Sequence, residues 1–137
     1  MAAKKRLPAD AFSLAMFEAA LFSSNDESDE SGGVPLDQNY GFEDIATPTW
    51  NGLIKEAREF QRENADDIAA GTVRGRYDPE VQAGHDFWLT RNGHGAGFWD
   101  GDWPEGAEDR LTDSSRRFGE VNLYVHRGRI YAAGFER

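Results

Sequence analysis

The residues best suited to chemistry gather in one stretch, residues 84–103, with the sequence GHDFWLTRNGHGAGFWDGDW. A histidine oriented by a carboxylate can act as a general base, which makes His85, Asp86, His94 and Asp100 the acid–base candidates. The chain has no cysteine, and no serine stands in a G-x-S-x-G context that would mark a nucleophile. We therefore assign no catalytic residue and expect His94 to be an exposed turn residue.

Metal binding is a second chemistry that these residues allow. His85, His94 and His126, with the nearby aspartates, are ligands of the type that zinc or iron prefers. Nothing in the spacing brings them together, and the acidic run at 25–30 lacks the ligand register of an EF-hand. We therefore expect no metal site and no cofactor.

The tryptophans of the same stretch indicate binding. We expect a β-hairpin that turns at Asn92-Gly93, since both residue types tolerate positive φ. Alternation then leaves one aromatic set on a second sheet face, to be covered by helices or by a partner. Aromatic residues beside an arginine are typical of interface hot spots and of stacking on a ring. The hypothetical binding residues are Trp88, Arg91, His94, Trp99 and Trp103.

The rest of the chain supplies the elements that would position this stretch. Apolar spacing predicts helices over 8–22, 48–70 and about 105–118. Alternation of Val121, Leu123 and Val125 with polar residues predicts a second hairpin at 120–135. We predict an α+β fold in which two or three helices pack on a four-stranded antiparallel sheet made of the hairpins 84–103 and 120–135.

The charge is strongly acidic and unevenly distributed. A chain of 137 residues with net charge −10 is expected to form a single domain, 1–137, with an exposed acidic loop at 23–41 that could be mobile. Such acidity disfavours direct nucleic-acid binding and favours a partner with a basic surface. The candidate acidic surface consists of Asp26, Glu27, Asp29, Glu30, Glu43 and Asp44.

The apolar N-terminal segment raises the questions of targeting and of self-association. Asp10 and Glu18 interrupt it, which argues against a signal peptide, and no apolar run is long enough to span a membrane. We expect a cytoplasmic protein without membrane contact. Because the 8–22 helix is apolar almost all round, it is either central in the core or buried in a homodimer interface.

Four segments of the chain carry a resemblance to a known family. They are the early helix running into the acidic loop, AGHDFWLTRNGHGAGFWDGDW, a DRLT helix and the terminal EVNLYVHRGRIY. Together they resemble a family of small hypothetical proteins encoded mostly by bacteriophages and prophages, over about residues 12–131. The resemblance implies a phage accessory protein in the host cytoplasm. The family has no assigned activity, so no catalytic residue is carried over.

Two functions follow for the chain. The preferred one is a non-enzymatic protein of the counter-defence type, which binds and modulates or inhibits a host factor, with its acidic surface imitating nucleic acid. The alternative is a small-molecule or nucleotide-binding protein, or an enzyme, with a pocket beside 84–103. That pocket would gather His85, Arg91, His94 and Trp99.

Overall fold

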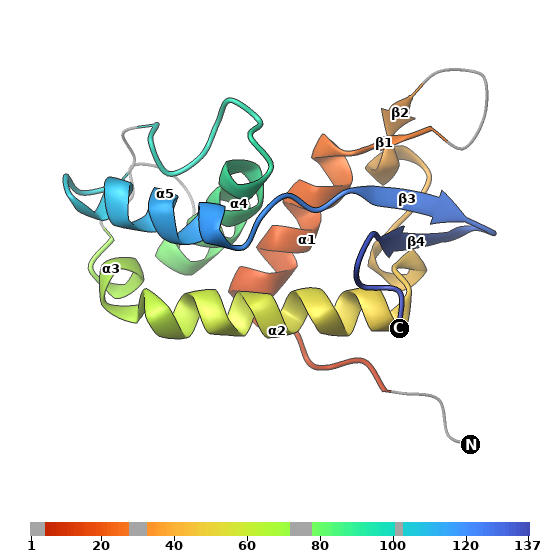
Figure 1. Ribbon diagram of the computed structural model, residues 1–137, viewed down its shortest axis with the longest axis horizontal. Coiled ribbons are helices and arrows are strands. Elements are labelled where there is room, and N and C mark those ends of the chain that lie inside the picture. Colours follow the sequence, from red (N-terminus) through yellow and green to blue (C-terminus); the bar gives the residue numbers. More distant parts are fainter. Residues whose placement is uncertain (1–4, 28–32, 72–77, 101–102) are drawn as a thin grey trace.

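The computed structural model describes residues 5–27, 33–71, 78–100 and 103–137. These residues form a mainly helical molecule with two separate two-stranded antiparallel sheets. In Figure 1, α2 runs along one side, α4 and α5 lie above its C-terminal half, and α1 crosses between them and the strands. The elements are α1 (Ala11–Ser23), β1 (Asn25–Asp26), β2 (Val34–Pro35), the 3-10 turns η1 (Leu36–Gln38) and η2 (Phe42–Asp44), α2 (Thr47–Glu63), α3 (Ala65–Ala69), α4 (Pro79–Arg91), α5 (Ala107–Arg117), β3 (Leu123–His126) and β4 (Arg129–Ala132).

The predicted four-stranded sheet is wrong, because residues 84–103 do not form a hairpin. Most of the expected first strand belongs to helix α4, which begins at Pro79. Gly93, with φ of +65°, ends this helix. Its N–H donates to the carbonyl of Thr90 (3.2 Å), and the N–H of His94 donates to the carbonyl of Leu89 (3.1 Å). This is a Schellman helix end, in which only Gly93 adopts positive φ, since Asn92 has φ of −100°. The Asn92-Gly93 pair therefore ends a helix and does not form a hairpin turn.

The expected C-terminal hairpin is confirmed. β3 pairs with β4 in the register Tyr124 opposite Tyr131, and the turn between them has positive φ at Arg127 (52°) and Gly128 (76°). These angles are typical of a two-residue type I′ turn, whose twist matches that of the strands.

The helices expected over 8–22 and 105–118 are present as α1 and α5, whereas the one expected over 48–70 divides into α2 and α3 at Asn64. The buried Asn64 amide donates to the carbonyl of Phe60 (2.9 Å) and to Ser114 Oγ (2.8 Å), which ties the break to α5.

The loop expected at 23–41 contains β1, β2 and η1, and its residues 28–32 lie outside the described chain. Within the described residues, no helix is both long enough and apolar enough to cross a membrane.

Helix α4 is central because a glycine lets α1 cross it closely. A Cβ atom on Gly84 would lie 2.2 Å from the carbonyl oxygen of Phe12 and 2.9 Å from Cβ of Ala15. Around this crossing, the rings of Phe12, Phe60 and Phe87 pack within 5.8 Å of one another. The core is therefore aromatic, and its geometry depends on the absence of a side chain at position 84.

Replacing Gly84 with alanine tests this crossing. Alanine raises helix propensity by about 1 kcal/mol, but its methyl group would collide with the α1 backbone, so we expect a net loss of about 1–3 kcal/mol in the free energy of unfolding. Chemical denaturation measures the change. Glu80→Ala, at an exposed position of the same helix, is the control and should change stability by less than about 0.5 kcal/mol. A Gly84→Ala variant as stable as the wild type would contradict the close crossing.

Asp10 caps α1 and gives a pH-dependent prediction. Burial raises its pKa, but hydrogen bonds from Ser13 and Gln61 outweigh burial and leave the pKa below its ordinary value. A folded-state pKa that is depressed stabilises the protein above the unfolded-state pKa and ceases to do so as the pH falls through the folded-state value. Asp10→Ala should therefore cost about 1 kcal/mol at pH 7, and the difference from wild type should shrink in acid. Chemical denaturation of both proteins at pH 7 and in acid measures the difference in the free energy of unfolding. A difference that does not change with pH would contradict the role of the Asp10 carboxylate.

Candidate functional site

The β3–β4 hairpin has one edge that the rest of the chain occupies, the edge of β4. The N–H of Ala46 donates to the carbonyl of Ile130 (2.8 Å), and the N–H of Ala132 donates to Thr49 Oγ1 (3.1 Å). The segment that starts α2 thus covers β4 and satisfies two of its outward-facing backbone groups.

The opposite edge, that of β3, is free. In an antiparallel pair, directly opposed residues alternate between exchanging hydrogen bonds and facing away from each other. Because Ile130 and Ala132 face away from β3, their partners Val125 and Leu123 must face away from β4. No hydrogen bond within the described chain joins the backbone of Leu123 or Val125 to another segment. Two N–H and two C=O groups are therefore presented along this edge.

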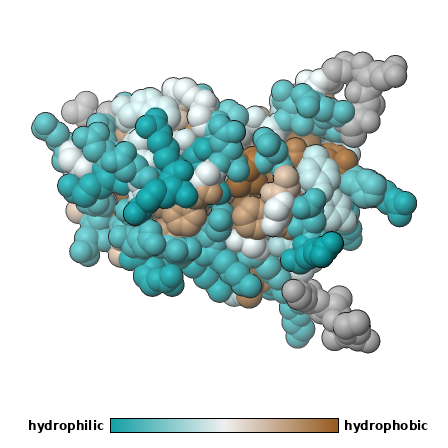
Figure 2. Space-filling view, in the orientation of Figure 1, coloured by the Kyte–Doolittle hydropathy of each residue, from teal (hydrophilic) through white to brown (hydrophobic). Residues whose placement is uncertain are grey.

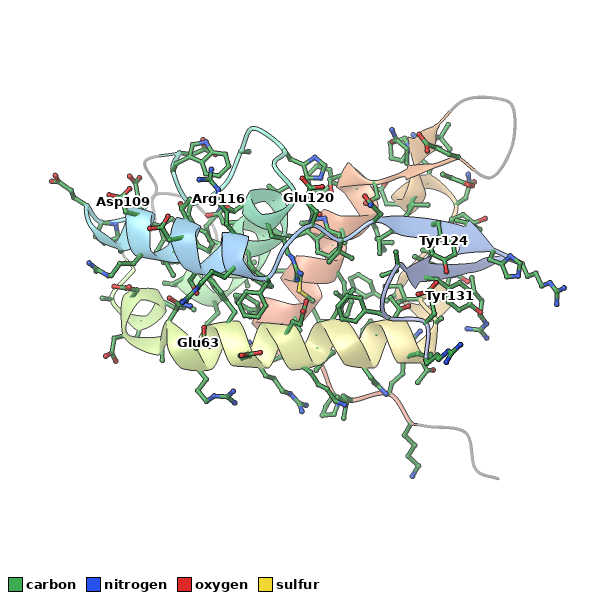
Figure 3. All side chains as sticks on the ribbon, viewed as in Figure 1. Glu63, Asp109, Arg116, Glu120, Tyr124 and Tyr131 are labelled. Carbon is green, nitrogen blue, oxygen red and sulfur yellow. The ribbon has the colours of Figure 1, made fainter. Side chains whose placement is uncertain are left out.

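A polar cavity of about 220 Å³, the β3-edge groove, begins at this edge. One wall comes from the end of α1 and from β1, the other from the segment that enters β3, and the loop after α4 contributes the rest. Its lining residues are Ser23, Ser24, Asn25, Glu27, Asn92, His94, Glu120, Val121, Asn122 and Leu123. Figure 3 shows Glu120 between the end of α5 and the start of β3.

The groove has an acidic character. Glu27 and Glu120 are both exposed, and neither lysine nor arginine is among the lining residues. His94 is exposed in the same groove. Two carboxylates with no lysine or arginine among the described lining residues attract a positively charged group. The groove therefore combines a strand edge with a preference for cationic side chains.

Buried Arg91 holds the wall of the groove in place. Its guanidinium donates to the carbonyls of Gly119 (2.7 Å) and Phe118 (2.8 Å) and to Glu56 Oε1 (2.7 Å). It also lies over the rings of Phe87 and Phe118. Burial lowers the pKa of Arg91, and Glu56 opposes that shift. An arginine paired in this way remains charged, so it caps the end of α5 with a full positive charge.

The next residue, Asn92, completes the support. Its Oδ1 accepts a hydrogen bond from the N–H of Val121 (2.8 Å), and its Nδ2 donates to the carbonyl of Trp88 (2.9 Å). Arg91 and Asn92 together fix residues 118–121 to the end of α4. The direction in which the chain enters β3 is set by these contacts.

The exposed face of the hairpin carries an aromatic pair next to the free edge. The rings of Tyr124 and Tyr131 stack with centroids 5.8 Å apart, and Figure 3 shows them side by side on the strands. The Tyr124 hydroxyl donates to Glu136 (2.6 Å), which raises the pKa of Tyr124 and lowers that of Glu136. A strand added to β3 would place alternate side chains beside Tyr124.

The structure separates the five predicted binding residues. Trp88, Arg91 and Trp103 are buried, with exposed fractions of 0%, 4% and 4%, and so belong to the interior. Trp99 is 37% exposed, and Cζ of Arg116 lies over its ring, 5.7 Å from the ring centroid. His94 alone of the five lines the β3-edge groove. The surface that they were expected to share is not formed in the free molecule.

The acid–base candidates are also dispersed. His85 pairs with Glu18 of α1 (3.2 Å). Asp86 is buried and accepts from Trp103 Nε1 (2.8 Å), and Asp100 accepts from the N–H of Gly97 (3.0 Å). Each of these groups contacts a neighbouring element, and neither Arg91 nor Trp99 lines any of five well-formed pockets of the described residues. In the described part of the chain, no group of three or more potential metal ligands occurs.

The six acidic residues divide between two places. Asp26 belongs to β1 and Glu27 follows it, whereas Glu43 and Asp44 lie in η2, where the Asp44 carboxylate accepts from the N–H of Gly41 (2.9 Å). Asp29 and Glu30 lie outside the described residues. The guanidinium of Arg6 donates to backbone carbonyls of η2, including that of Phe42 (2.9 Å), so a cation accompanies this acidic pair.

Comparison of the chain with protein-family models, with curated proteins and with solved structures gave no match.

Arg91→Met tests whether the buried guanidinium supports the site. It removes three hydrogen bonds and two ring contacts and leaves Glu56 without its arginine partner, so we expect a loss of about 3 kcal/mol in the free energy of unfolding. Arg116→Met, at an exposed arginine, should cost less than about 1 kcal/mol. Equal stability of the two variants in urea denaturation would show that Arg91 has no such role.

Proposed function

We propose that this protein is a non-enzymatic binding protein that captures an extended, basic segment of another protein along the free edge of β3. The observation that carries the proposal is the outward-facing backbone of Leu123 and Val125, which has no partner in the described chain although the opposite edge of the hairpin is covered. Strand addition to such an edge is a recurring mode of peptide recognition.

The composition of β3 supports this use. Natural proteins blunt exposed strand edges with proline, lysine or bulges, because an open edge recruits other chains. β3 has the sequence LYVH, with none of these devices, and pairs regularly with β4. An edge left open in this way serves as a binding surface.

Charge defines the partner. Glu27 and Glu120 line the groove, and the chain as a whole carries a net charge of −10. A backbone hydrogen bond contributes a net ~1 kcal/mol, so the few bonds that β3 offers need side-chain contacts to reach useful affinity. Lysine or arginine side chains opposite the two glutamates supply such contacts, and the acidic field speeds the encounter.

The biological setting of the proposal follows from the resemblance to phage proteins. A phage accessory protein that holds a basic segment of a host factor would modulate or inhibit that factor in the host cytoplasm. Apolar surface in the middle of the face shown in Figure 2, between α5 and the β3–β4 hairpin, provides additional contact area for such a partner.

Peptide binding tests the proposal. A ten-residue peptide of alternating lysine and valine should bind the intact protein in isothermal titration calorimetry, whereas the glutamate–valine peptide should not. Val125→Pro removes an edge N–H that β4 does not use, and edge strands accept proline at such positions. We expect Val125→Pro to weaken binding at least tenfold.

Val125→Ala is the matched control, because it shortens the side chain but keeps the N–H. Circular dichroism confirms that both variants fold. Equal affinity of Val125→Pro and Val125→Ala for the lysine–valine peptide would refute strand addition. Glu27→Gln with Glu120→Gln should weaken binding and lower its salt dependence, and an unchanged salt dependence would refute the role of the two glutamates.

A further inference from the structure

A second cavity, of about 320 Å³, lies where the C-terminal segment meets the start of α2, on the side of the molecule where Figure 1 shows the C-terminus. It is formed by three segments that are far apart in the sequence: the N-terminal segment, the first turns of α2 and the last residues of the chain. Its main lining residues are Lys5, Leu7, Pro48, Lys55, Phe135 and Arg137.

The charge of this cavity is opposite to that of the protein. All three charged residues that line it, Lys5, Lys55 and Arg137, are cations, although acidic residues outnumber basic ones by 25 to 15 in the chain. None of the three forms an ion pair with another described residue. The neighbouring carboxylate of Glu136 accepts from the Tyr124 hydroxyl (2.6 Å) and from the N–H of Gly134 (2.8 Å), and Arg137 contributes to lowering its pKa.

The N-terminal wall of the cavity is fixed by hydrogen bonds. Asn51 Oδ1 accepts from the N–H of Leu7 (2.8 Å), and Asn51 Nδ2 donates to the carbonyl of Lys5 (3.1 Å). Trp50 Nε1 donates to the carbonyl of Leu7 (2.9 Å). The extended N-terminal segment is thereby held along α2, which keeps the backbone of Lys5 beside the helix that carries Lys55.

The apolar wall of the cavity requires a glycine inside α2. A Cβ atom on Gly52 would lie 2.3 Å from Cδ1 of Phe135, so the ring packs directly on the helix backbone. The carbonyl of Phe135 accepts from Thr49 Oγ1 (2.9 Å), which anchors the residue. A glycine within a helix costs about 1 kcal/mol relative to alanine. Here the absence of a side chain at Gly52 lets the Phe135 ring pack against the helix.

We propose that this cavity binds a small organic phosphate. A phosphate monoester carries a charge of about −1.5 to −2 at neutral pH, which suits three cations that form no ion pair with another described residue. The organic part would rest on Phe135, Leu7 and Pro48. The volume of the cavity lies at the lower end of the range of about 300–1,000 Å³ for ligand sites, which fits a ligand of mononucleotide size. This inference is independent of the strand-addition proposal.

Titration of the full chain with adenosine 5′-monophosphate, adenosine and inorganic phosphate tests the site by calorimetry. The nucleotide should bind saturably and adenosine should not. Lys55→Gln should weaken nucleotide binding at least tenfold, whereas Arg127→Gln, at a hairpin-turn arginine outside the cavity, should leave it unchanged. Phe135→Leu should weaken the binding of the nucleotide more than it weakens the binding of inorganic phosphate.

Three results would overturn the proposal. The first is the absence of saturable nucleotide binding. The second is equal weakening by Lys55→Gln and Arg127→Gln, which would mean non-specific attraction. The third is binding of inorganic phosphate as tight as that of the nucleotide, which would mean an adventitious ion only. Circular dichroism of each variant ensures that a lost fold is not taken for a lost site.

Discussion

The structure depends above all on the contacts of one buried cation, Arg91. It donates to the carbonyls of Phe118 and Gly119, which directly follow α5. It also pairs with Glu56 of α2 and lies against the rings of Phe87 and Phe118. A buried charge is tolerated only when its hydrogen bonds are met, so these partners must be in place together. Arg91 thus joins α2, α4 and α5 and determines where the chain leaves α5 for β3.

The candidate site follows from this constraint and from the unequal edges of the C-terminal hairpin. The segment that starts α2 occupies the edge of β4 through Ala46 and Thr49, whereas the edge of β3 faces an acidic groove. A rigid interior therefore presents a short, unprotected strand next to Glu27 and Glu120. Rigid presentation lowers the entropic cost of binding an extended segment, which is what a strand-adding surface requires.

Sequence patterns predicted the local elements better than their assembly. Alternation at Val121, Leu123 and Val125 predicted the terminal hairpin correctly, because a half-buried strand has a strict period of two. The Asn92-Gly93 pair led to the wrong prediction of a hairpin at 84–103, because positive φ suits both a hairpin turn and a helix end. The earlier Asp78-Pro79, a favourable helix start, was the signal for α4. The sequence analysis singled out His94 and Glu27 of the candidate site, but not Glu120. It could not show which strand edge is free, because that depends on the register of β3 and β4.

Amide hydrogen exchange along β3, measured by NMR on the intact protein, tests directly whether the edge of β3 is free. We expect the amide of Tyr124, which faces β4, to be protected, whereas the amides of Leu123 and Val125 should exchange at nearly the rate of an unstructured chain. Addition of the lysine–valine peptide should protect Leu123 and Val125 and leave Tyr124 unchanged. Protection of Leu123 and Val125 equal to that of Tyr124 in the free protein would contradict a free β3 edge.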